Sequence, residues 1–275
     1  MELLRMSDEF FAHRLKPGQK IKLQDVPTRG ERFHDDRAEA ERECDELRSE
    51  FAEWQNRLYA EGKQRLLVVL QATDAGGKDG TIRKVFCGVN PQGVRVASFK
   101  KPSDDELAHD FLWRIHKKVP ASGMIQVFNR SHYEDVLVVR VHNIVPREVW
   151  KPRYQLINEF EKMLTDNGTT ILKFYLHISK DEQKERFQSR LDDPDKTWKF
   201  SKEDLDKRKH WDDYIEAFED AIQQCTTKHA PWFVIPADQK WYRNLAILRS
   251  IVGTLREMNP CYPAPESGLD EIVIE

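Results

Sequence analysis

The segment most informative about the fold is Leu66-Leu67-Val68-Val69-Leu70, followed closely by Ala72-Thr73-Asp74-Ala75-Gly76-Gly77-Lys78-Asp79-Gly80-Thr81. Five consecutive apolar residues that end at a turn indicate a short strand buried on both faces, as in a parallel sheet. The small residues that follow allow backbone N–H groups to wrap phosphate oxygens. The helix expected from Thr81 would point its N-terminus at the anion. Lys78 stands where a Walker A loop carries its phosphate-bridging lysine, so the segment predicts a phosphate-binding loop.

The loop departs from the standard Walker A pattern. Ala72 replaces the first glycine, and Asp79 stands where a hydroxyl residue usually follows the lysine. Asp74 adds a carboxylate, which repels bare phosphate but suits Mg²⁺. We therefore expect Asp74 to hold metal and the rest of the loop to contact phosphate through Ala75, Gly76, Gly77, Lys78, Asp79, Gly80 and Thr81. The alternative is a glycine-rich turn that binds nothing.

Four similar apolar runs follow the first strand: Val94–Phe99, Met124–Phe128, Thr170–Leu176 and Trp232–Ile235. Helix-like segments separate them: Thr81–Phe86, Asp104–Lys117, Pro152–Leu164, Lys180–Leu191 and Lys240–Glu257. Ser179 and Glu182 have the spacing of a capping box. Strands that alternate with helices predict an α/β fold with a parallel sheet.

A helix is also expected before the first strand, from Arg37 to about Ala60. Its apolar residues recur every three or four positions, at Cys44, Leu47, Phe51, Trp54 and Leu58. This spacing gives one apolar face. The face would pack on the core or, as the alternative, bind a partner.

Composition limits the function classes. The chain has 275 residues, a net charge of -3, and 39% hydrophobic and 33% charged residues, which fits one globular domain. The bulk charge disfavours nucleic acid and membrane surfaces as partners, and no stretch has the roughly 20 apolar residues of a membrane span. Four scattered cysteines, without a CxxC pair, favour a reducing compartment such as the cytoplasm.

The run Met124–Phe128 ends in Asn129-Arg130-Ser131-His132-Tyr133-Glu134-Asp135. In phosphate-loop proteins, the strand beside the loop delivers a metal-directed acid at its end. Here that position holds Asn129, whose amide can accept from a metal-bound water, so we predict Asp74 and Asn129 as the metal site. Arg130 would clamp a phosphate. Glu134 would assist the metal or, as the alternative, cap a helix together with Asp135.

His132 admits two interpretations. A phosphohistidine intermediate is conceivable, but in-line transfer on a phosphate loop needs no covalent nucleophile. We therefore favour a structural or orienting His132.

Residues 180–213 are dense in both charges and predict a helical lid that closes over the transferred phosphate and excludes water. Arg186 and Arg190 lie one helical turn apart and are the strongest pair of candidates. Lys199 and Arg208 are further candidates, whereas many of the other charges would form a solvated surface. Basic residues also surround the second apolar run, where kinases of this type bind the acceptor: Lys100, Lys101, Arg114, Lys117 and Lys118. The turn Pro236–Lys240 would contact a nucleobase or serve as an ordinary turn.

Four fragments together resemble the polyphosphate kinase 2 family over about residues 17–257. They are Asp74-Ala-Gly-Gly-Lys-Asp-Gly-Thr81, Phe128-Asn-Arg-Ser-His-Tyr-Glu134, Trp198-Lys-Phe-Ser201 and Pro231-Trp-Phe-Val-Ile-Pro-Ala-Asp238. Asn129, where other members carry Asp, is similar to the subgroup that accepts both nucleoside mono- and diphosphates.

The resemblance implies inorganic polyphosphate as donor, AMP and ADP as acceptors with guanine nucleotides as an alternative, and Mg²⁺ with Mn²⁺ as an alternative. It implies a three-layer α/β/α fold like that of thymidylate kinase, with a helical lid, and a homo-oligomer, often a tetramer. It assigns Asp74 to metal, Lys78 and Arg130 to phosphates, and four lid bases to the polyphosphate or the migrating group: Arg186, Arg190, Lys199 and Arg208.

One domain, 1–275, is therefore expected. It would comprise an N-terminal arm and helix (1–62), the phosphate loop (72–81), the lid (about 180–213) and a C-terminal tail (259–275). Two other functions stay open: an ATP-dependent nucleoside monophosphate kinase, and a nucleotide-binding regulatory module without turnover. A nucleic-acid binder is the weakest candidate, because no basic and aromatic recognition motif is present.

Overall fold

The five predicted strands form one sheet. In the computed structural model, which describes residues 10–269, 272 and 274, they are β1 (Arg65–Gln71), β2 (Val94–Ser98), β3 (Ile125–Asn129), β4 (Thr169–His177) and β5 (Trp232–Pro236). Their order is β2-β3-β1-β4-β5, and all neighbouring pairs are parallel. The predicted parallel α/β sheet is confirmed. The strand that precedes the phosphate loop, β1, lies at its centre.

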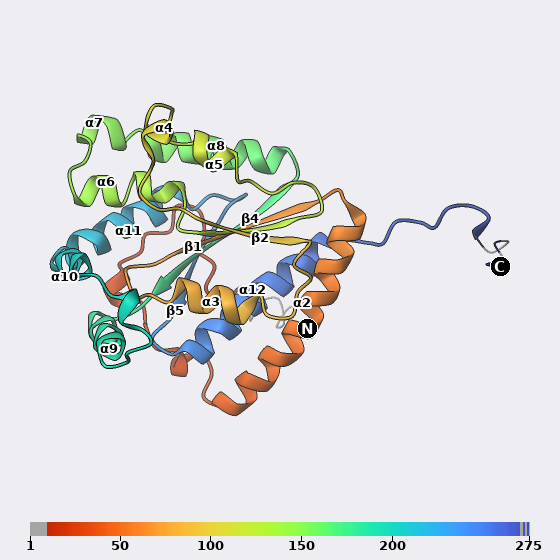
Figure 1. Cartoon of the computed structure of the whole chain (residues 1–275), viewed down its shortest axis with the longest axis horizontal. Coiled ribbons are helices and arrows are strands. Elements are labelled where there is room, and N and C mark those ends of the chain that lie inside the picture. The colour runs from red at the N-terminus through yellow and green to blue at the C-terminus, as the bar shows by residue number, and fades with distance from the viewer. Residues whose placement is uncertain (1–9, 270–271, 273, 275) are drawn as a thin grey trace.

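Helices cover both faces of the sheet (Figure 1). One face carries α2 (Arg37–Glu61), α3 (Lys78–Val85) and α12 (Lys240–Met258), and the other carries α8 (Arg153–Asp166) and α11 (Trp211–Cys225). Successive residues of β1 point to opposite faces. Leu66, Val68 and Leu70 join the core under α2 and α12, whereas Leu67 and Val69 join the core under α8 and α11. The three-layer architecture is therefore as predicted.

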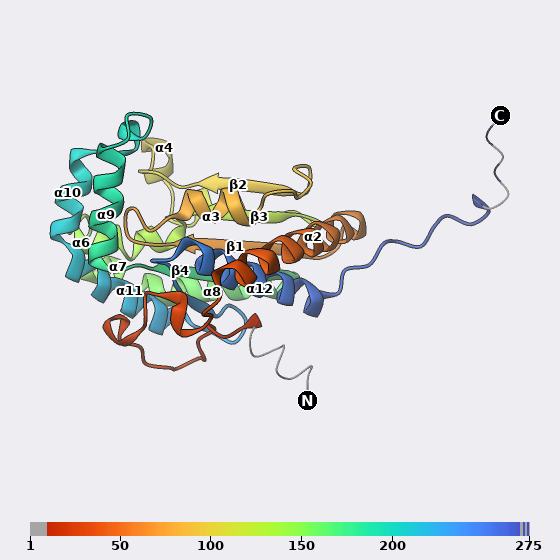
Figure 2. The same ribbon diagram turned by 90° about the horizontal axis from the view of Figure 1, so that it is seen from below.

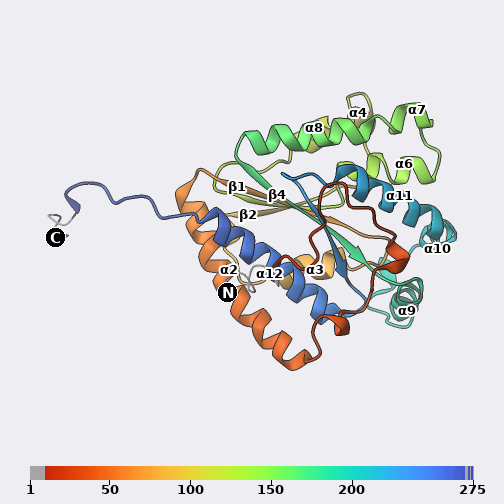
Figure 3. The same cartoon turned by 180° about the vertical axis from the view of Figure 1, so that it is seen from behind.

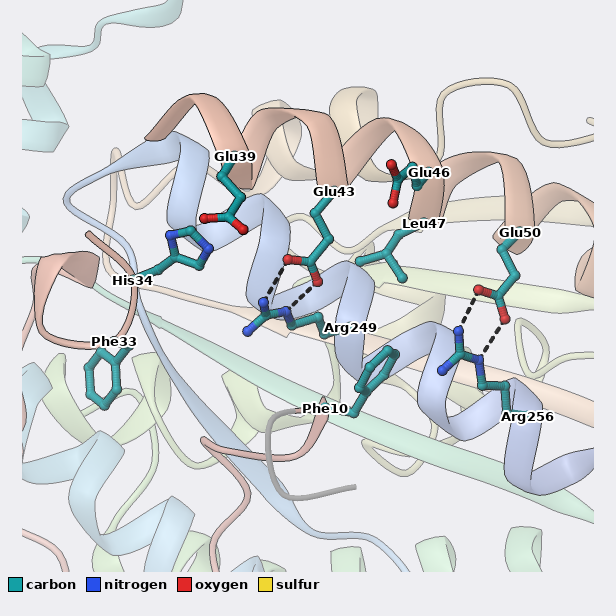
Figure 4. Close-up of a pocket in the computed structure, with 10 residues that line it drawn as sticks. All are labelled: Phe10, Phe33, His34, Glu39, Glu43, Glu46, Leu47, Glu50, Arg249 and Arg256. Atoms are coloured by element: carbon teal, nitrogen blue, oxygen red, sulfur yellow. Dashed lines mark hydrogen bonds and ion pairs between the residues drawn. The ribbon is translucent and has the colours of Figure 1, made fainter. Parts of the chain in front are cut away.

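The pairing of α2 with α12 confirms the predicted packing face. Cys44, Leu47, Phe51 and Leu58 are buried in the core that includes α12. Two bidentate ion pairs border this contact, Glu43 with Arg249 and Glu50 with Arg256, each with N–O distances of 2.6 Å (Figure 4). This face of α2 is therefore occupied within the chain and does not require a partner protein.

The predicted helix over Asp104–Lys117 is wrong. The structure has two single-turn helices there, α4 (Asp104–Leu107) and α5 (Trp113–His116). Between them Asp110 Oδ1 accepts a hydrogen bond from the Leu112 N–H at 2.9 Å, and such local side-chain bonds compete with helix formation. The expected burial of the second strand on both faces is also wrong, because β2 is an edge strand and Val96 is 49% exposed.

The segment between β4 and β5 begins with α9 (Lys180–Leu191), the 3₁₀ turn η4 (Thr197–Lys199) and α10 (Lys202–Lys209), which lie together at one end of the sheet (Figure 2). Ser179 Oγ accepts from the Glu182 N–H at 3.1 Å. The Glu182 carboxylate instead binds Arg186 at 2.6 Å, so the predicted capping box is only half formed. The remaining short helices are η1 (Leu23–Asp25), η2 (Gly30–Arg32), η3 (His132–Asp135), α6 (Val138–Val141) and α7 (Arg147–Trp150).

Residues 10–35 do not form a free arm but cross the β5 side of the molecule (Figure 3). Arg14 forms an antiparallel bridge with Phe233, and Leu23 is completely buried. The expected tail leaves the body of the fold after α12, as Figure 2 shows for its described residues. The expectations for residues 1–9, 270–271, 273 and 275 lie outside the described residues. In the part of the chain that the structure describes, no helix has the length and apolarity to cross a membrane.

Candidate active site

The phosphate loop turns sharply between β1 and α3. Ala75 (φ 60°) and Gly77 (φ 101°) are left-handed. A Cβ on Gly76 would lie 2.4 Å from Ala72 Cβ, so only glycine fits there without a shift. α3 begins at Lys78 with Gly77 as its N-cap, and the cap has no side chain to accept the first helical N–H groups. These N–H groups can therefore bind an anion, as predicted for this loop.

Lys78 reaches back over the loop, where its Nζ donates to the Ala72 carbonyl at 3.1 Å. Burial, with a further contribution from the nearby Arg130 guanidinium, lowers the pKa of Lys78 from 10.5 to about 8. Its charge is therefore incompletely compensated by the protein. A phosphate beside Lys78 would favour the protonated amine.

Asp74 collects positive charge from two parts of the chain. Its Oδ1 lies 3.1 Å from Arg130 Nη2, and its Oδ2 lies 3.4 Å from Lys207 Nζ of α10. Burial favours the neutral acid, but the charges of Lys78, Arg130 and Lys207 outweigh it and lower the pKa of Asp74. The carboxylate is therefore ionised at neutral pH.

The end of β3 brings two further predicted residues to the loop. Asn129 pairs with Leu70 of β1 in the sheet register, and its Nδ2 donates to Asp79 Oδ1 at 2.6 Å. Arg130 follows in a left-handed conformation with φ 63°. Burial lowers the pKa of Arg130, but the carboxylates of Glu134 and Asp74 outweigh that effect and raise it. Parallel strands thus deliver the two halves of the predicted site to the same edge of the sheet.

The predicted lid pair divides into two different roles. Arg186 donates to the Ala75 carbonyl at 3.0 Å and to the Ala237 carbonyl at 2.6 Å, which ties α9 to the phosphate loop and to the end of β5. Arg190 instead donates to the Lys199 carbonyl at 3.2 Å. Of these two arginines, Arg186 is the one that is hydrogen-bonded to the phosphate loop in the described structure.

Two further predicted residues, Lys199 and Arg208, are not gathered at the loop. Lys199 lies over the exposed Trp198 ring. Arg208 donates to the Lys180 carbonyl at 2.7 Å and to Gln183 at 2.8 Å. Thr81 lies in the first turn of α3 and is completely buried, and its hydroxyl donates to the Gly77 carbonyl at 3.1 Å. Its contact with phosphate stays a prediction.

A cavity of about 430 Å³ opens beside Asp74 and Arg130. Its polar lining includes Asp74, Lys100, Lys101, Arg130, Glu134 and Lys207. Its apolar lining includes Phe99, Pro102, Leu107, Leu137, Val138, Val139, Ile144 and Val145. An apolar pocket with a few convergent charges is the usual form of a small-molecule site.

Arg114 and Asp135 support the wall of this cavity. Arg114 is 7% exposed and donates to the Lys100 carbonyl at 2.8 Å. Its other nitrogen lies 3.8 Å from Asp135, which also accepts from Arg153 at 3.3 Å. Arg114 therefore lies at the predicted site, but its nearest partners are groups of the protein itself.

Two groups at the loop were not predicted from the sequence. Arg243 of α12 is 2% exposed and reaches the Gly77 carbonyl at 3.5 Å, and burial together with Arg186 lowers its pKa to about 10. Gln183 of α9 donates to the Asp74 carbonyl at 2.9 Å. Position after the last strand was the only signal for Arg243, whereas Lys207 lies within the predicted lid segment but was not predicted as a partner of Asp74.

A divalent metal fits the donor set. Mg²⁺ takes oxygen ligands and is held in phosphate-transferring sites by one or two carboxylates together with substrate phosphates. Asp74 supplies an ionised carboxylate, and the hydrogen bond from Asn129 to Asp79 uses the amide nitrogen, not the oxygen. Among the described residues, no group of three or more His, Cys, Asp and Glu side chains could hold a metal. The Asp74 carboxylate and the Asn129 amide oxygen are therefore two oxygen donors that fit a divalent metal.

The chain is similar to known proteins over most of its length. Residues 34–262 match the family described as Polyphosphate kinase 2. An AMP/ADP-polyphosphate phosphotransferase of Meiothermus ruber is 61% identical over 80% of this chain and 83% of that protein. An ADP-polyphosphate phosphotransferase of Rhodopseudomonas palustris is 42% identical over 91% of each. The crystal structure of polyphosphate kinase 2 from Arthrobacter aurescens superposes with a TM-score of 0.91, at 41% identity over 96% of this chain and 94% of that one.

Proposed function

The chain belongs to the polyphosphate kinase 2 family, and on that premise we propose that it transfers a phosphoryl group from inorganic polyphosphate to AMP and to ADP. The observation that best supports this proposal is the convergence of Lys78, Arg130 and Lys207 on one carboxylate. This carboxylate, Asp74, lies at the edge of a cavity with an apolar wall. Positive charge suits a polyanionic donor, and an apolar wall suits a nucleobase.

The acceptor nucleotide occupies the cavity in this proposal. Its base lies against the apolar residues, among them Leu137 and Val138, and its phosphates face Arg130. The arginine fork binds phosphate oxygens in two directions at once. The polyphosphate end lies over the phosphate loop, where the N-terminus of α3 and Lys78 bind its terminal group.

The reaction is a direct in-line displacement. A terminal oxygen of AMP or ADP attacks the end phosphorus of polyphosphate, the bridging P–O bond breaks, and a shortened polyphosphate leaves. Lys78, Arg130 and Arg186 stabilise the charge on the transferred group. The leaving polyphosphate is a weak base, so no strong general acid is needed. Asp74 is the group best placed to orient or deprotonate the acceptor.

We propose Mg²⁺ as the metal, with Mn²⁺ as a substitute. Asp74 and the Asn129 amide would hold it, and when bound it would neutralise phosphate charge and align the two substrates. Lys207 now shares Asp74, so binding of the metal requires Lys207 to give up part of this contact. Lys207 would then be able to contact phosphate instead.

The lid role of residues 180–213 is part of the proposal. Arg186 already bridges α9 and the phosphate loop, and Lys207 bridges α10 and Asp74. Arg190, Lys199 and Arg208 would reach the polyphosphate only after a rearrangement of this segment, because their present contacts lie within the segment itself.

The proposal also covers the oligomeric state of the protein and its cellular compartment. We expect a homo-oligomer, with a tetramer as the first candidate, which light scattering of the purified protein would measure. We expect the cytoplasm as the compartment, since adenine nucleotides are abundant there and all four cysteines are unpaired thiols.

The test is luminescent detection of ATP with purified protein, Mg²⁺, long-chain polyphosphate and either ADP or AMP, without added ATP. ATP from ADP is expected, and ATP from AMP as well would support the dual acceptor range. A parallel reaction without polyphosphate controls for disproportionation of ADP. Phosphorylation of AMP only when ATP is supplied as donor would contradict the proposal and favour an ordinary nucleoside monophosphate kinase.

A further inference from the structure

Three consecutive residues between Arg130 and Glu134 are completely buried. Ser131, His132 and Tyr133 are each 0% exposed, while Arg130 and Glu134 on either side of them line the cavity. The turn formed by residues 130–134 thus has its interior in the core and its two ends at the candidate site. A displacement of the buried part would move the ends.

Charged side chains from two other elements hold the buried part of this turn. Glu161 of α8 accepts from Tyr133 Oη at 2.9 Å and from His132 Nε2 at 3.2 Å. Lys173 of β4 donates to Glu161 Oε2 at 2.6 Å, to Tyr133 Oη at 2.8 Å and to the Cys225 carbonyl at 2.6 Å. We call His132, Tyr133, Glu161 and Lys173 the buried ion cluster; all four are 0% exposed.

The ionisation of Glu161 and of Tyr133 follows from their surroundings. Burial favours neutral Glu161, but the Lys173 charge and the hydrogen bond from His132 outweigh it and lower the pKa of Glu161. Burial raises the pKa of Tyr133 well above its ordinary value, so the hydroxyl keeps its proton and donates to the carboxylate. Glu161 therefore accepts hydrogen bonds from both Tyr133 and Lys173.

Stability alone does not account for this arrangement. A buried ion pair costs about as much in desolvation as it gains, and apolar residues of similar size are often as stable. His132 Nδ1 is buried and has no hydrogen-bond partner among the described residues, which is a further cost. Arg130 itself is held at φ 63°, a conformation that persists in a non-glycine residue only where its surroundings enforce it.

We propose that the buried ion cluster is a positioning device that fixes the turn so that Arg130 and Glu134 face the reacting phosphates. Ser131 completes the anchor, because its hydroxyl accepts from the Tyr133 N–H at 3.2 Å and from Gln71 of β1 at 3.3 Å. The turn is thus bonded to β1, β4 and α8. This role explains the buried His132 as an orienting residue, and its complete burial contradicts the phosphohistidine alternative.

The inference rests on the proposed function, and Glu161→Gln tests it with little change of shape. The variant keeps an acceptor for Tyr133 and His132 but weakens the bond to Lys173. We expect kcat for ATP formation from polyphosphate and ADP to fall about 10- to 100-fold, because small displacements of a phosphate-binding group are costly. KM for ADP should also rise, because Arg130 faces the phosphates of the acceptor in the proposed function.

Two comparisons separate positioning from general destabilisation. Glu219→Gln is the matched control, since Glu219 is also buried and bonded to Lys22 and to the Leu23 N–H, far along the chain from the turn. It should lower the melting temperature without lowering kcat. In an Arg130→Ala background, Glu161→Gln should reduce kcat by less than about 3-fold, because the group that it positions is already absent.

Tyr133→Phe is the second probe if Glu161→Gln does not fold. It removes one hydroxyl, leaves the Lys173–Glu161 pair in place, and should lower kcat by at least about 3-fold with the same dependence on Arg130. Wild-type kcat in folded Glu161→Gln or Tyr133→Phe, or a full loss that persists in the Arg130→Ala background, would overturn the proposal.

A binding measurement keeps this inference separate from the proposed reaction. The rise in melting temperature on adding ADP, whose phosphates face Arg130 in the proposed function, should depend on Arg130 and should shrink in Glu161→Gln but not in Glu219→Gln. If the wild-type protein makes no ATP from polyphosphate, the proposed function fails, and this shift alone decides the positioning role. An undiminished shift in Glu161→Gln would then overturn it.

Discussion

The charged groups at the edge of the sheet and those of residues 180–213 are bonded in different ways. At the sheet edge the partners are distant in sequence, as with Asp74 and Arg130 at 3.1 Å. In residues 180–213 many bonds are local, as with Lys209 and Asp206 at 2.7 Å, or Arg190 and the Lys199 carbonyl at 3.2 Å. The first set is held by the core, and the second mainly by its own segment.

This difference indicates that the two sets of charged groups have different roles. Groups fixed by the core cost little reorganisation when charge develops in a transition state. Locally bonded groups can move together when a lid closes. Arg186 and Lys207 join the two regions, since Arg186 contacts the Ala75 carbonyl and Lys207 contacts Asp74. Variants of these two residues therefore test whether the two regions act differently.

The largest effect is expected at the sheet edge. Lys78→Ala removes the amine that lies over the phosphate loop, and kcat/KM for polyphosphate should fall about 10²- to 10³-fold, as for other groups that stabilise transition-state charge. Circular dichroism and melting temperature should remain close to wild type. Near-normal activity in the folded variant would contradict the assignment of the loop.

The two predicted lid arginines should differ. Arg186→Met removes bonds to the Ala75 and Ala237 carbonyls and should lower kcat about 10- to 100-fold, through misplacement of the loop and through loss of a positive charge beside the transferred group. Arg190→Met is the matched variant one turn away and should lower kcat less than about 5-fold, as expected for a mostly local contact. Equal losses in the two variants would show that the division between the two regions is wrong.

The pH dependence of the free enzyme should report Lys78. Its pKa is lowered to about 8, and the protonated form binds phosphate. As pH rises through that value the amine loses its charge, so kcat/KM should fall tenfold per unit at higher pH. Lys78→Arg should shift this limb to higher pH or remove it. An unchanged limb in Lys78→Arg would assign the titration to another group.

The smallest effect concerns the metal. Lys207→Met removes a cation that shares Asp74, so the half-saturating Mg²⁺ concentration should decrease about 2- to 5-fold, the scale of a partly exposed ion pair. Tryptophan fluorescence without substrates provides the readout, because Trp211 lines the cavity. Lys209→Met, which removes the exposed pair with Asp206, is the control. Weaker Mg²⁺ binding in Lys207→Met would contradict competition for Asp74.

Local patterns predicted most of the fold. The five strands and the phosphate loop follow from apolar runs and small residues in continuous stretches, and the sheet then brings Asn129 and Asp79 together through the register of β1 and β3. The helix expected over Asp104–Lys117 fails because Asp110 makes its own local hydrogen bond, which periodicity does not reveal. The prediction that β2 is buried on both faces is wrong because β2 lies at the edge of the sheet. Which strand lies at the edge depends on how the chain crosses over between strands, and an apolar run does not reveal this.

The site was only partly predictable for a similar reason. Asp74, Lys78 and Arg130 lie in or beside strand ends, where topology alone gathers them. Arg243 reaches the Gly77 carbonyl only because α12 packs beside α3, and Glu161 reaches the turn after β3 from the middle of α8. Such long-range contacts produce no regular spacing of residues in the sequence from which they could be predicted. The contact of Thr81 with phosphate stays a prediction, and its hydroxyl donates to the Gly77 carbonyl.

Direct phosphoryl transfer from polyphosphate to ADP is tested most simply by following the phosphoryl group itself. Purified protein with Mg²⁺, polyphosphate labelled with ³²P and unlabelled ADP should yield ATP labelled at its γ position, with no label retained on the protein after denaturation. ATP without label, or label bound covalently to the chain, would contradict direct transfer from polyphosphate.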